Sequence, residues 1–321
     1  MISALDARLR RWRGEEEAGE YFSLRWRNPF KEQYINASLN RFGGGMGPYT
    51  DSLVKLRSVP YINASPIDNI GDYNYIATMC PKRNTFAHFW HMVWERRVPI
   101  VVNLTHLDDR VGSGASDKRE VYWPTEVGAG GAMRLDGGLC VVLEAVETVP
   151  GIDGLTKHSI ALSGPGQGGP APDDGKSSDS FTTTMYWYSQ WVDFGDSRDI
   201  YNAPFKENSR NVLRVAKTVD AHQREMESRL AGRQWMVVHC SAGVGRTGTF
   251  ITLMRLLHVV PQLKCIESID RTVKVTIEAM RQRRLWMVKT DGEYATIYCA
   301  LLEHFASDTT LHAGPSLVNE A

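Results

Sequence analysis

The stretch VVHCSAGVGRTGTF, residues 237–250, decides the fold of this chain. The apolar run before Cys240, at 235–239, predicts a short buried strand. The run TGTFITLMRLLHVV, from Thr247, predicts a helix that Pro261 ends. Strand, loop of small residues and helix follow one another in the order that phosphate-binding sites use. The loop itself is made of Ser241, Ala242, Gly243, Val244 and Gly245.

The chemistry of this loop follows from its residue types. Small residues let successive backbone N–H groups turn inward and form a concavity that binds anions. The N-terminal end of the following helix adds positive potential, and Arg246 supplies a planar fork for two phosphate oxygens. The same dipoles favour the thiolate form of Cys240, which would lie below a bound phosphate ester and attack its phosphorus. Thr247 can donate its hydroxyl to the sulfur when the sulfur leaves. The alternative is a packed core cysteine after a strand.

Protonation of a leaving group requires an acid on another segment. The run QWVDFGDS (190–197) offers Asp193, whose aromatic neighbours would raise a carboxyl pKa as an acid requires. Trp191 is interpreted as the hinge anchor of a closing lid. In isolation, an ordinary turn residue is the favoured interpretation of Asp193, and only the need of the Cys240 loop for an acid reverses it.

Composition limits the other possibilities. The chain has 321 residues, with 37 basic and 37 acidic side chains, so the net charge is zero and nothing global points to nucleic acid. Its five cysteines are widely spaced without a C-x-x-C pair, which argues against a disulfide framework or a zinc site and favours a reducing cytosol. No secretory signal and no membrane-spanning run is found, so a cytoplasmic location without a membrane span is expected.

The sequence organisation predicts one catalytic domain at 21–306, preceded by a charged arm or helix at 1–20 and followed by a disordered tail at 307–321. The low-complexity stretch at 164–180 predicts a flexible loop that joins two hairpin strands. Helical spacing predicts three further helices: 208–230, 268–283 and 291–305.

These residues resemble the family of tyrosine-specific, cysteine-dependent protein phosphatases, of the non-receptor-type catalytic-domain kind. The motifs VHCSAGVGRTGTF and WVDFG carry the resemblance, with PYINAS (60–65), PKRNTFAHFWHMVWE (81–95), YWP (122–124) and MVKTDGEY (287–294) in the family's order. The resemblance implies an α/β fold: a twisted, mixed central sheet with helices on both sides. It also implies phosphotyrosine-containing protein substrates and two chemical steps without a metal or cofactor. Cys240 is then the nucleophile, Arg246 binds phosphate, and Asp193 acts first as acid and later as base.

Other positions carry over from the same resemblance. Phe42 falls where a tyrosine ring stacks on phosphotyrosine in the family, and simple core packing is its alternative. Asp109 falls at the position of a glutamate that pairs with the loop arginine, and Lys118 falls near the lysine of the acid loop. Solvated surface charge is the alternative for both.

Several residues depart from the family pattern. Val192 replaces a proline, and GGGMG (43–47) lacks a substrate-gripping aspartate. Lys289 and Glu293 occupy the positions of two glutamines that place the hydrolytic water. An ammonium group donates hydrogen bonds but accepts none, so a slowed second step is expected.

Two rival functions remain open at this point. A pseudo-phosphatase that captures phosphotyrosine is favoured by Val192, Lys289 and Glu293. A phosphoinositide phosphatase would usually place lysines inside the loop, and SAGVG has none.

Overall fold

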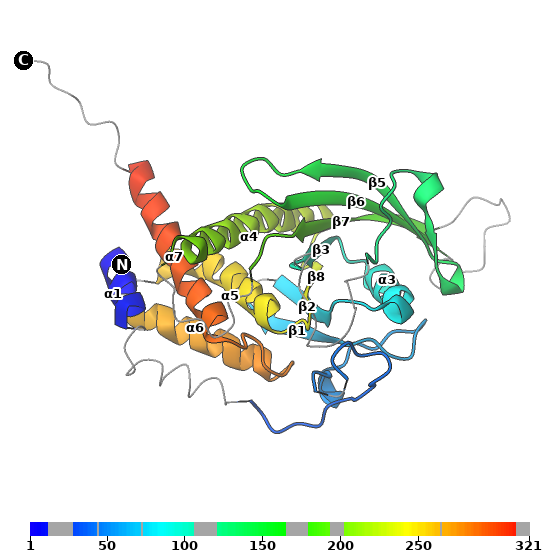
Figure 1. Ribbon diagram of the computed structural model, residues 1–321, viewed down its shortest axis with the longest axis horizontal. Helices are drawn as coiled ribbons and strands as arrows, with labels where there is room; N and C mark the ends of the chain where they lie inside the picture. Colours follow the sequence, from blue (N-terminus) through cyan, green and yellow to red (C-terminus); the bar gives the residue numbers. More distant parts are fainter. Residues whose placement is uncertain are drawn as a thin grey trace, which may run out of the picture.

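The computed structural model describes residues 1–11, 28–43, 45–71, 73–105, 121–164, 179–192, 202–263 and 265–312. Its frame is a single eight-stranded, mixed sheet in the order β1-β2-β8-β3-β7-β6-β5-β4 (Figure 1). The neighbours β2, β8, β3 and β7 run parallel, while β1 and the β7-to-β4 side pair antiparallel. The mixed α/β sheet predicted from the resemblance is thus confirmed. The strands are β1 Ala64–Ile70, β2 Tyr73–Met79, β3 Ile100–Asn103, β4 Met133–Arg134, β5 Cys140–Thr148, β6 Leu155–Gly164, β7 Asp179–Tyr188 and β8 Trp235–Cys240.

Helices cover both faces of the sheet, because its central strands are apolar on both sides. The helix α3 packs on one face, where Phe89, Trp90 and Val93 join a fully buried cluster. The helices α4 and α5 pack on the other face, with α6, α7 and α1 outside them (Figure 1). The helices are α1 Ile2–Arg11, α3 Phe86–Glu95, α4 Ala203–Leu230, α5 Gly245–Val259, α6 Ile266–Arg281 and α7 Asp291–His312, with short 3₁₀ turns at Thr50–Ser52, Arg83–Thr85, Ala129–Gly131, Asp136–Gly138 and Val260–Gln262.

The predicted elements lie close to the observed ones, with differences at their ends. The helix α4 begins at Ala203 instead of 208, because the Asn202 side chain accepts a hydrogen bond from the Phe205 N–H at 2.7 Å and Pro204 opens the first turn. The antiparallel pairing of β6 with β7 confirms the predicted hairpin, while most of its loop, 165–178, lies outside the described residues.

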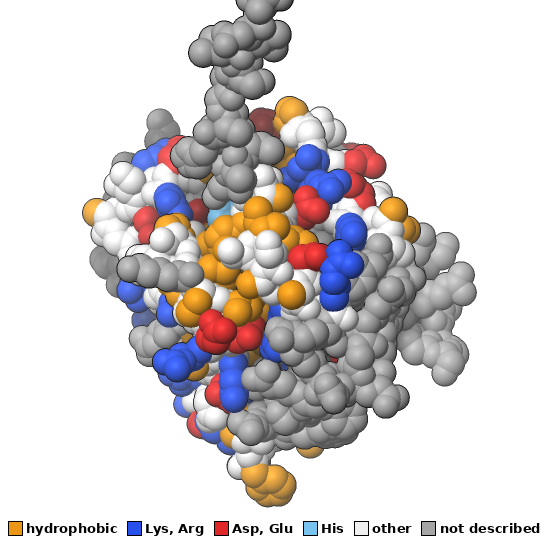
Figure 2. Space-filling view, turned by 90° about the vertical axis from the view of Figure 1, so that its left-hand side faces the viewer, with side chains coloured by type: hydrophobic (Ala, Val, Ile, Leu, Met, Phe, Trp, Pro, Cys, Tyr) orange, Lys and Arg blue, Asp and Glu red, His pale blue; other side chains and the backbone are white. Residues whose placement is uncertain are grey.

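The two chain ends differ from the prediction in one respect. Within the predicted arm, α1 is helical and packs its buried Leu5 and Leu9 on the core. The predicted tail began too early, since α7 continues to His312 and residues 307–312 are helical. Figure 2 shows the face formed by α1, α6 and α7, where apolar side chains gather between charged ones.

Candidate active site

The predicted nucleophile lies at the carboxyl ends of the parallel strands. Ligands of open α/β sheets bind at the carboxyl ends of such strands. Cys240 is the last residue of β8, and it pairs in register with Met79 at the end of β2. The end of β3 lies on the other side, where Asn103 pairs with His239. The nucleophile candidate therefore stands in the centre of the sheet, between two strand ends.

The loop after Cys240 turns its carbonyl groups away from the site. The Ser241 carbonyl accepts a hydrogen bond from the Cys80 N–H at 3.1 Å. The Ala242 and Gly243 carbonyls accept from the guanidinium of Arg284 at 3.0 and 2.8 Å. A peptide unit that points its carbonyl outward points the next N–H inward. Among the described residues, the backbone N–H groups of 241–245 have no hydrogen-bond partner, which is the condition for an anion-binding concavity.

Two glycines of the loop are required by close contacts. Gly243 has φ 69°, and a Cβ there would overlap the carbonyl of Thr78 in β2. A Cβ at Gly245 would overlap the carboxylate of Glu293 in α7. Only glycine satisfies both the left-handed backbone and the backbone contact at 243, whereas a side chain at 245 would have to displace the Glu293 carboxylate. The loop is therefore shaped by β2 on one side and by α7 on the other.

Arg246 and Thr247 begin α5 directly behind the loop, and both are buried. The Arg246 guanidinium donates to the Leu104 carbonyl at 3.1 Å and to the Trp191 carbonyl at 3.4 Å. These bonds tie the predicted phosphate-binding arginine to the start of the predicted acid loop. The Thr247 hydroxyl has no hydrogen-bond partner among the described residues, so its predicted bond to the Cys240 sulfur is not formed in this structure.

The acid-loop segment is described only at its beginning. Trp191 is buried, and the Val192 N–H donates to the side-chain oxygen of Asn208 in α4 at 3.1 Å. Helix α4 thus anchors the start of the loop. The other acid-loop and supporting predictions, Asp193, Asp109 and Lys118, lie outside the described residues.

Phe42 lies on a turn that is tied to the strand end beside Cys240. The Arg41 N–H donates to the Met79 sulfur at 3.0 Å, and the Arg41 guanidinium donates to the Pro81 carbonyl at 2.9 Å. Asn40 accepts from the Tyr61 hydroxyl at 2.7 Å. Phe42 itself is half-buried. This anchoring supports its predicted position at the wall of the pocket.

Lys289 and Glu293 are placed next to the loop, but their side chains face different groups. The Glu293 carboxylate accepts from the N–H groups of Lys289 at 2.7 Å and Thr290 at 3.0 Å. The Lys289 ammonium lies over the indole ring of Trp286, 5.4 Å from its centroid. Trp286 and Val288 both have φ of 57°, a conformation that costs non-glycine residues energy and that often marks functional loops.

Arg284 is the most important site residue that the sequence analysis missed. It is fully buried, and its partners besides the loop carbonyls are Asn63 Oδ1 at 2.7 Å and Ser65 Oγ at 3.3 Å. Burial lowers the pKa of Arg284 to about 10, while electrostatic interactions with Tyr61 and Cys240 act in the opposite direction. The guanidinium is therefore charged at neutral pH, within electrostatic reach of Cys240. The motif YINAS at 61–65 gave the available signal, since it supplies two of these partners.

His239, directly before Cys240, links the strand to YWP. Its Nε2 lies 2.6 Å from the Tyr122 hydroxyl, and burial raises the pKa of Tyr122 well above its usual value. The His239 Nδ1 lies 3.2 Å from the Cys240 carbonyl. Both rings are fully buried, so they fix the backbone that carries the nucleophile.

The comparison with protein families agrees with this geometry. The family model described as protein-tyrosine phosphatase matches residues 36–303. The chain belongs to the protein-tyrosine phosphatase family. The predicted family is thus confirmed, and the match covers every described residue of the site.

The similar proteins are receptor-type phosphatases. The chain is 32% identical over 294 residues to receptor-type tyrosine-protein phosphatase F of Rattus norvegicus, which covers 89% of this chain and 13% of that protein. It is 33% identical over 269 residues to receptor-type tyrosine-protein phosphatase epsilon of Homo sapiens, covering 81% of this chain and 32% of that protein. This protein-tyrosine phosphatase chain therefore spans about a third or less of the length of these relatives. None of the helices in the described part of the chain has the length and apolar character that a bilayer crossing requires.

Proposed function

We propose that this chain hydrolyses phosphotyrosine in proteins through a phosphocysteine intermediate. The single observation that carries the proposal is the Cys240 loop: its N–H groups at 241–245 have no partner among the described residues, and its carbonyls are held outward by Cys80 and Arg284. A site of this kind is preorganised for a phosphoryl dianion. Family membership supports the same chemistry.

In the first step, the Cys240 sulfur attacks phosphorus and the bond from phosphorus to the tyrosine oxygen breaks. Asp193 donates its proton to the leaving phenolate. The loop N–H groups and Arg246 hold the phosphoryl oxygens during transfer. Inside the buried loop these interactions are worth more than in water, because competing solvent is excluded.

In the second step, water attacks phosphorus and the sulfur–phosphorus bond breaks. Asp193 takes a proton from this water, and inorganic phosphate leaves with the thiolate restored. We assign Thr247 to this step as the donor to the leaving sulfur, a role supported by its buried hydroxyl at the start of α5, which has no competing partner among the described residues.

The test compares turnover of p-nitrophenyl phosphate and a phosphotyrosyl peptide with that of phosphoseryl, phosphothreonyl and inositide substrates. We expect hydrolysis of the first two and none by Cys240→Ser, which keeps the loop but replaces the nucleophile. Preference for the inositide, or hydrolysis that survives in Cys240→Ser, would contradict the proposal. The half-buried Phe42 supports a deep pocket that a phosphoserine side chain is too short to fill.

A second candidate function is a phosphotyrosine-binding module that turns over poorly. It is favoured by the Glu293 carboxylate, which is engaged by the Lys289 and Thr290 N–H groups, and by the Lys289 ammonium, which lies on Trp286. Neither group has the amide chemistry that both donates to and accepts from a water. A rapid burst of one product equivalent followed by slow steady turnover would favour this candidate.

The non-receptor-type assignment and the cytoplasmic location stay predictions. The relatives named above are receptor-type, and the chain corresponds to a part of their length. Fractionation of cells that express the whole protein, with an antibody against this domain, tests both. Recovery in the membrane pellet after a high-salt wash would contradict them.

A further inference from the structure

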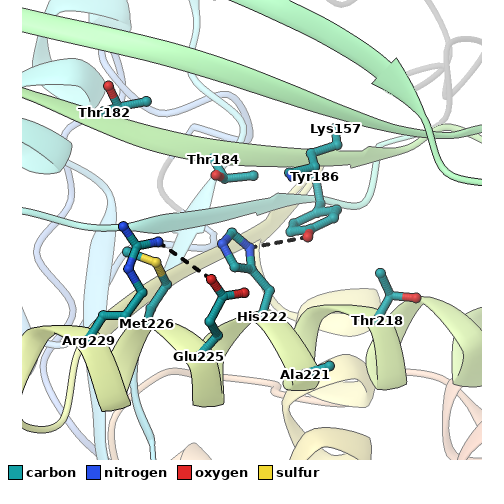
Figure 3. Close-up of a pocket in the computed structure, with 10 residues that line it drawn as sticks. All are labelled: Lys157, Thr182, Thr184, Tyr186, Thr218, Ala221, His222, Glu225, Met226 and Arg229. Atoms are coloured by element: carbon teal, nitrogen blue, oxygen red, sulfur yellow. Dashed lines mark hydrogen bonds and ion pairs between the residues drawn. The ribbon is translucent and has the colours of Figure 1, made fainter.

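A polar groove of about 610 Å³ lies between β6, β7 and the C-terminal half of α4 (Figure 3). It is separate from the Cys240 loop, since none of its lining residues belongs to that loop, to β8 or to α5. Its volume is in the range of small-molecule sites. The lining residues are Lys157, Thr182, Thr184, Tyr186, Thr218, Ala221, His222, Glu225, Met226 and Arg229.

Both walls of the groove are polar where a helix packed on a sheet would ordinarily be apolar. Alternate residues of β7, at 182, 184 and 186, carry hydroxyl groups and line the groove, and the Thr182 hydroxyl donates to the Glu144 carboxylate of β5 at 3.4 Å. On α4, residues 218, 222, 225 and 229 follow one another at helical spacing and form the facing wall. Figure 3 shows His222, Glu225 and Arg229 rising from the helix toward the strands. The groove is therefore an open polar cleft and not a packing defect of the core.

The cations of the groove are held only loosely by carboxylates. Lys157 lies 3.9 Å from Glu147, and Arg229 lies 3.5 Å from Glu225. All four side chains are more than a third exposed, so these pairs are weak and easily exchanged for another anion. Lys157 comes from the strand wall and Arg229 from the helix wall.

The pKa of His222 depends on the burial and the charges inside the groove. Burial lowers its pKa, and the positive charges of Lys157 and Arg229 lower it further, while Glu225 acts in the opposite direction. Its Nδ1 lies 3.2 Å from the Tyr186 hydroxyl. Burial raises the pKa of Tyr186 to about 12, so that hydroxyl is neutral at physiological pH. The charged groups that act on His222 are thus two cations, Lys157 and Arg229, and one carboxylate, Glu225, while Glu147 of β5 faces Lys157 at the rim.

We propose that this groove is a second, non-catalytic site for the phosphate group of a small phosphorylated metabolite that carries hydroxyl groups. A phosphate monoester brings two negative charges and three acceptor oxygens, which match Lys157, Arg229 and the threonine hydroxyls. The remaining hydroxyl groups of the walls both donate and accept, so they suit an alcohol-bearing ligand. This site does not depend on the catalytic role of Cys240.

Nuclear magnetic resonance titration of the His222 imidazole tests the proposal in the intact chain, with the resonance assigned from His222→Gln. The probes are glycerol 3-phosphate, inorganic phosphate and glycerol. A phosphate dianion beside the ring favours its charged form, so we expect saturating glycerol 3-phosphate to raise the pKa of His222 by about one unit. Glycerol alone leaves it unchanged. An equal effect of inorganic phosphate at the same affinity would assign the recognition to the phosphate alone and would contradict the hydroxyl part of the proposal.

Variants of the two cations complete the test. We expect Lys157→Met/Arg229→Met to weaken binding of glycerol 3-phosphate at His222 by about tenfold or more, because two charged hydrogen bonds are lost. Lys217→Met is the matched control, a cation on α4 that does not line the groove, and it leaves the affinity unchanged. Circular dichroism of each variant verifies its fold. The proposal is overturned if phosphate ligands leave the His222 resonance unmoved, or if the double variant binds as tightly as the parent chain.

Discussion

Two buried charges of this molecule have opposite surroundings. Arg284, behind the Cys240 loop, has neutral hydrogen-bond partners in the described part of the chain: two loop carbonyls, Asn63 and Ser65. Asp220, on the same side of the sheet but between α4 and α5, is matched by Arg224 at 2.9 Å and by His258 and Tyr73 at 2.5 and 2.7 Å. The charge of Arg284 is left to act on the nucleophile, while the charge of Asp220 is neutralised where it lies. A buried charge without a counter-charge points to function, and a matched one points to structure.

The largest effect is expected at Arg284. Arg284→Met releases the Ala242 and Gly243 carbonyls and removes the positive charge near Cys240, so turnover of p-nitrophenyl phosphate should fall by about 10²-fold or more. As Arg284 is a positioning residue, alkylation of Cys240 by iodoacetate is measured against pH as well. We expect the alkylation profile to move to higher pH, which loss of stability alone would not cause.

Two further variants make the Arg284 result interpretable. Arg284→Lys keeps the charge and should restore part of the activity if Arg284→Met fails to fold. Arg283→Met is the matched control: this neighbour pairs with Asp68 at 2.8 Å near the surface, and its loss should leave turnover unchanged. Equal losses of turnover in Arg284→Met and Arg283→Met would contradict a specific role of the buried Arg284 charge in catalysis.

Replacement of the predicted acid, Asp193, should have the next largest effect on turnover. Asp193→Ala should lower turnover of a phosphotyrosyl peptide by about 10²-fold, the usual range for general acid catalysis, while peptide binding persists. The measurement is kcat beside the dissociation constant of the Cys240→Ser/Asp193→Ala chain. Unchanged turnover would assign the protonation of the leaving phenolate to another group.

The second chemical step, hydrolysis of the phosphocysteine, should become faster when Lys289 and Glu293 are both replaced by glutamine. Lys289→Gln/Glu293→Gln supplies amides that donate and accept, so we expect steady turnover to rise by about tenfold and the pre-steady-state burst to shrink. Glu303→Gln, on α7 beside Arg210, is the control. A parent chain that shows no burst, with turnover limited by phosphorylation of Cys240, would count against this prediction.

Asp220 should affect stability and not chemistry. Asp220→Asn is expected to lower the free energy of unfolding by about 1–3 kcal/mol at pH 7, measured by urea denaturation, with turnover changed less than about twofold. Burial alone would raise the pKa of Asp220, but hydrogen bonds from His258 and Tyr73 and the charge of Arg224 lower it below its usual value. Its contribution is therefore present above the ordinary carboxyl pKa and is lost as pH falls through the lowered one. The stability difference between the two chains should shrink below about pH 4. A difference independent of pH would show that the carboxylate charge is not what stabilises this cluster.

The sequence was sufficient to predict the Cys240 loop but not to identify Arg284, which holds the carbonyl groups of the loop. Cys240 and the small residues after it predict strand, loop and helix because few other local structures accept that spacing. In contrast, the run RQRR at 281–284 is typical of a solvated surface. The helix α6 ends at Arg281, and beyond this end Arg284 turns inward to the loop while Arg283 reaches Asp68. That outcome depends on Asn63 and Ser65, more than two hundred residues away, and no local pattern encodes it.

Helix ends show the same limit. Apolar spacing located α4 but missed its first turn, where Asn202 and Pro204 supply the start. The polar groove at the other end of α4 was not predicted, because Thr182 and Thr184 look like exposed strand residues until the helix is placed opposite them.

The position of β8 in the sheet has a consequence for how this protein loses activity. Hydrogen bonds from β2 and β3 hold β8 on both edges, so we expect the strand that carries Cys240 to be among the slowest-exchanging parts of the chain. Fraying at the outer strands β4 and β5 leaves the nucleophile in place. Thermal inactivation should therefore coincide with melting of the whole domain, and a partly opened molecule should still form the thiol-phosphate adduct.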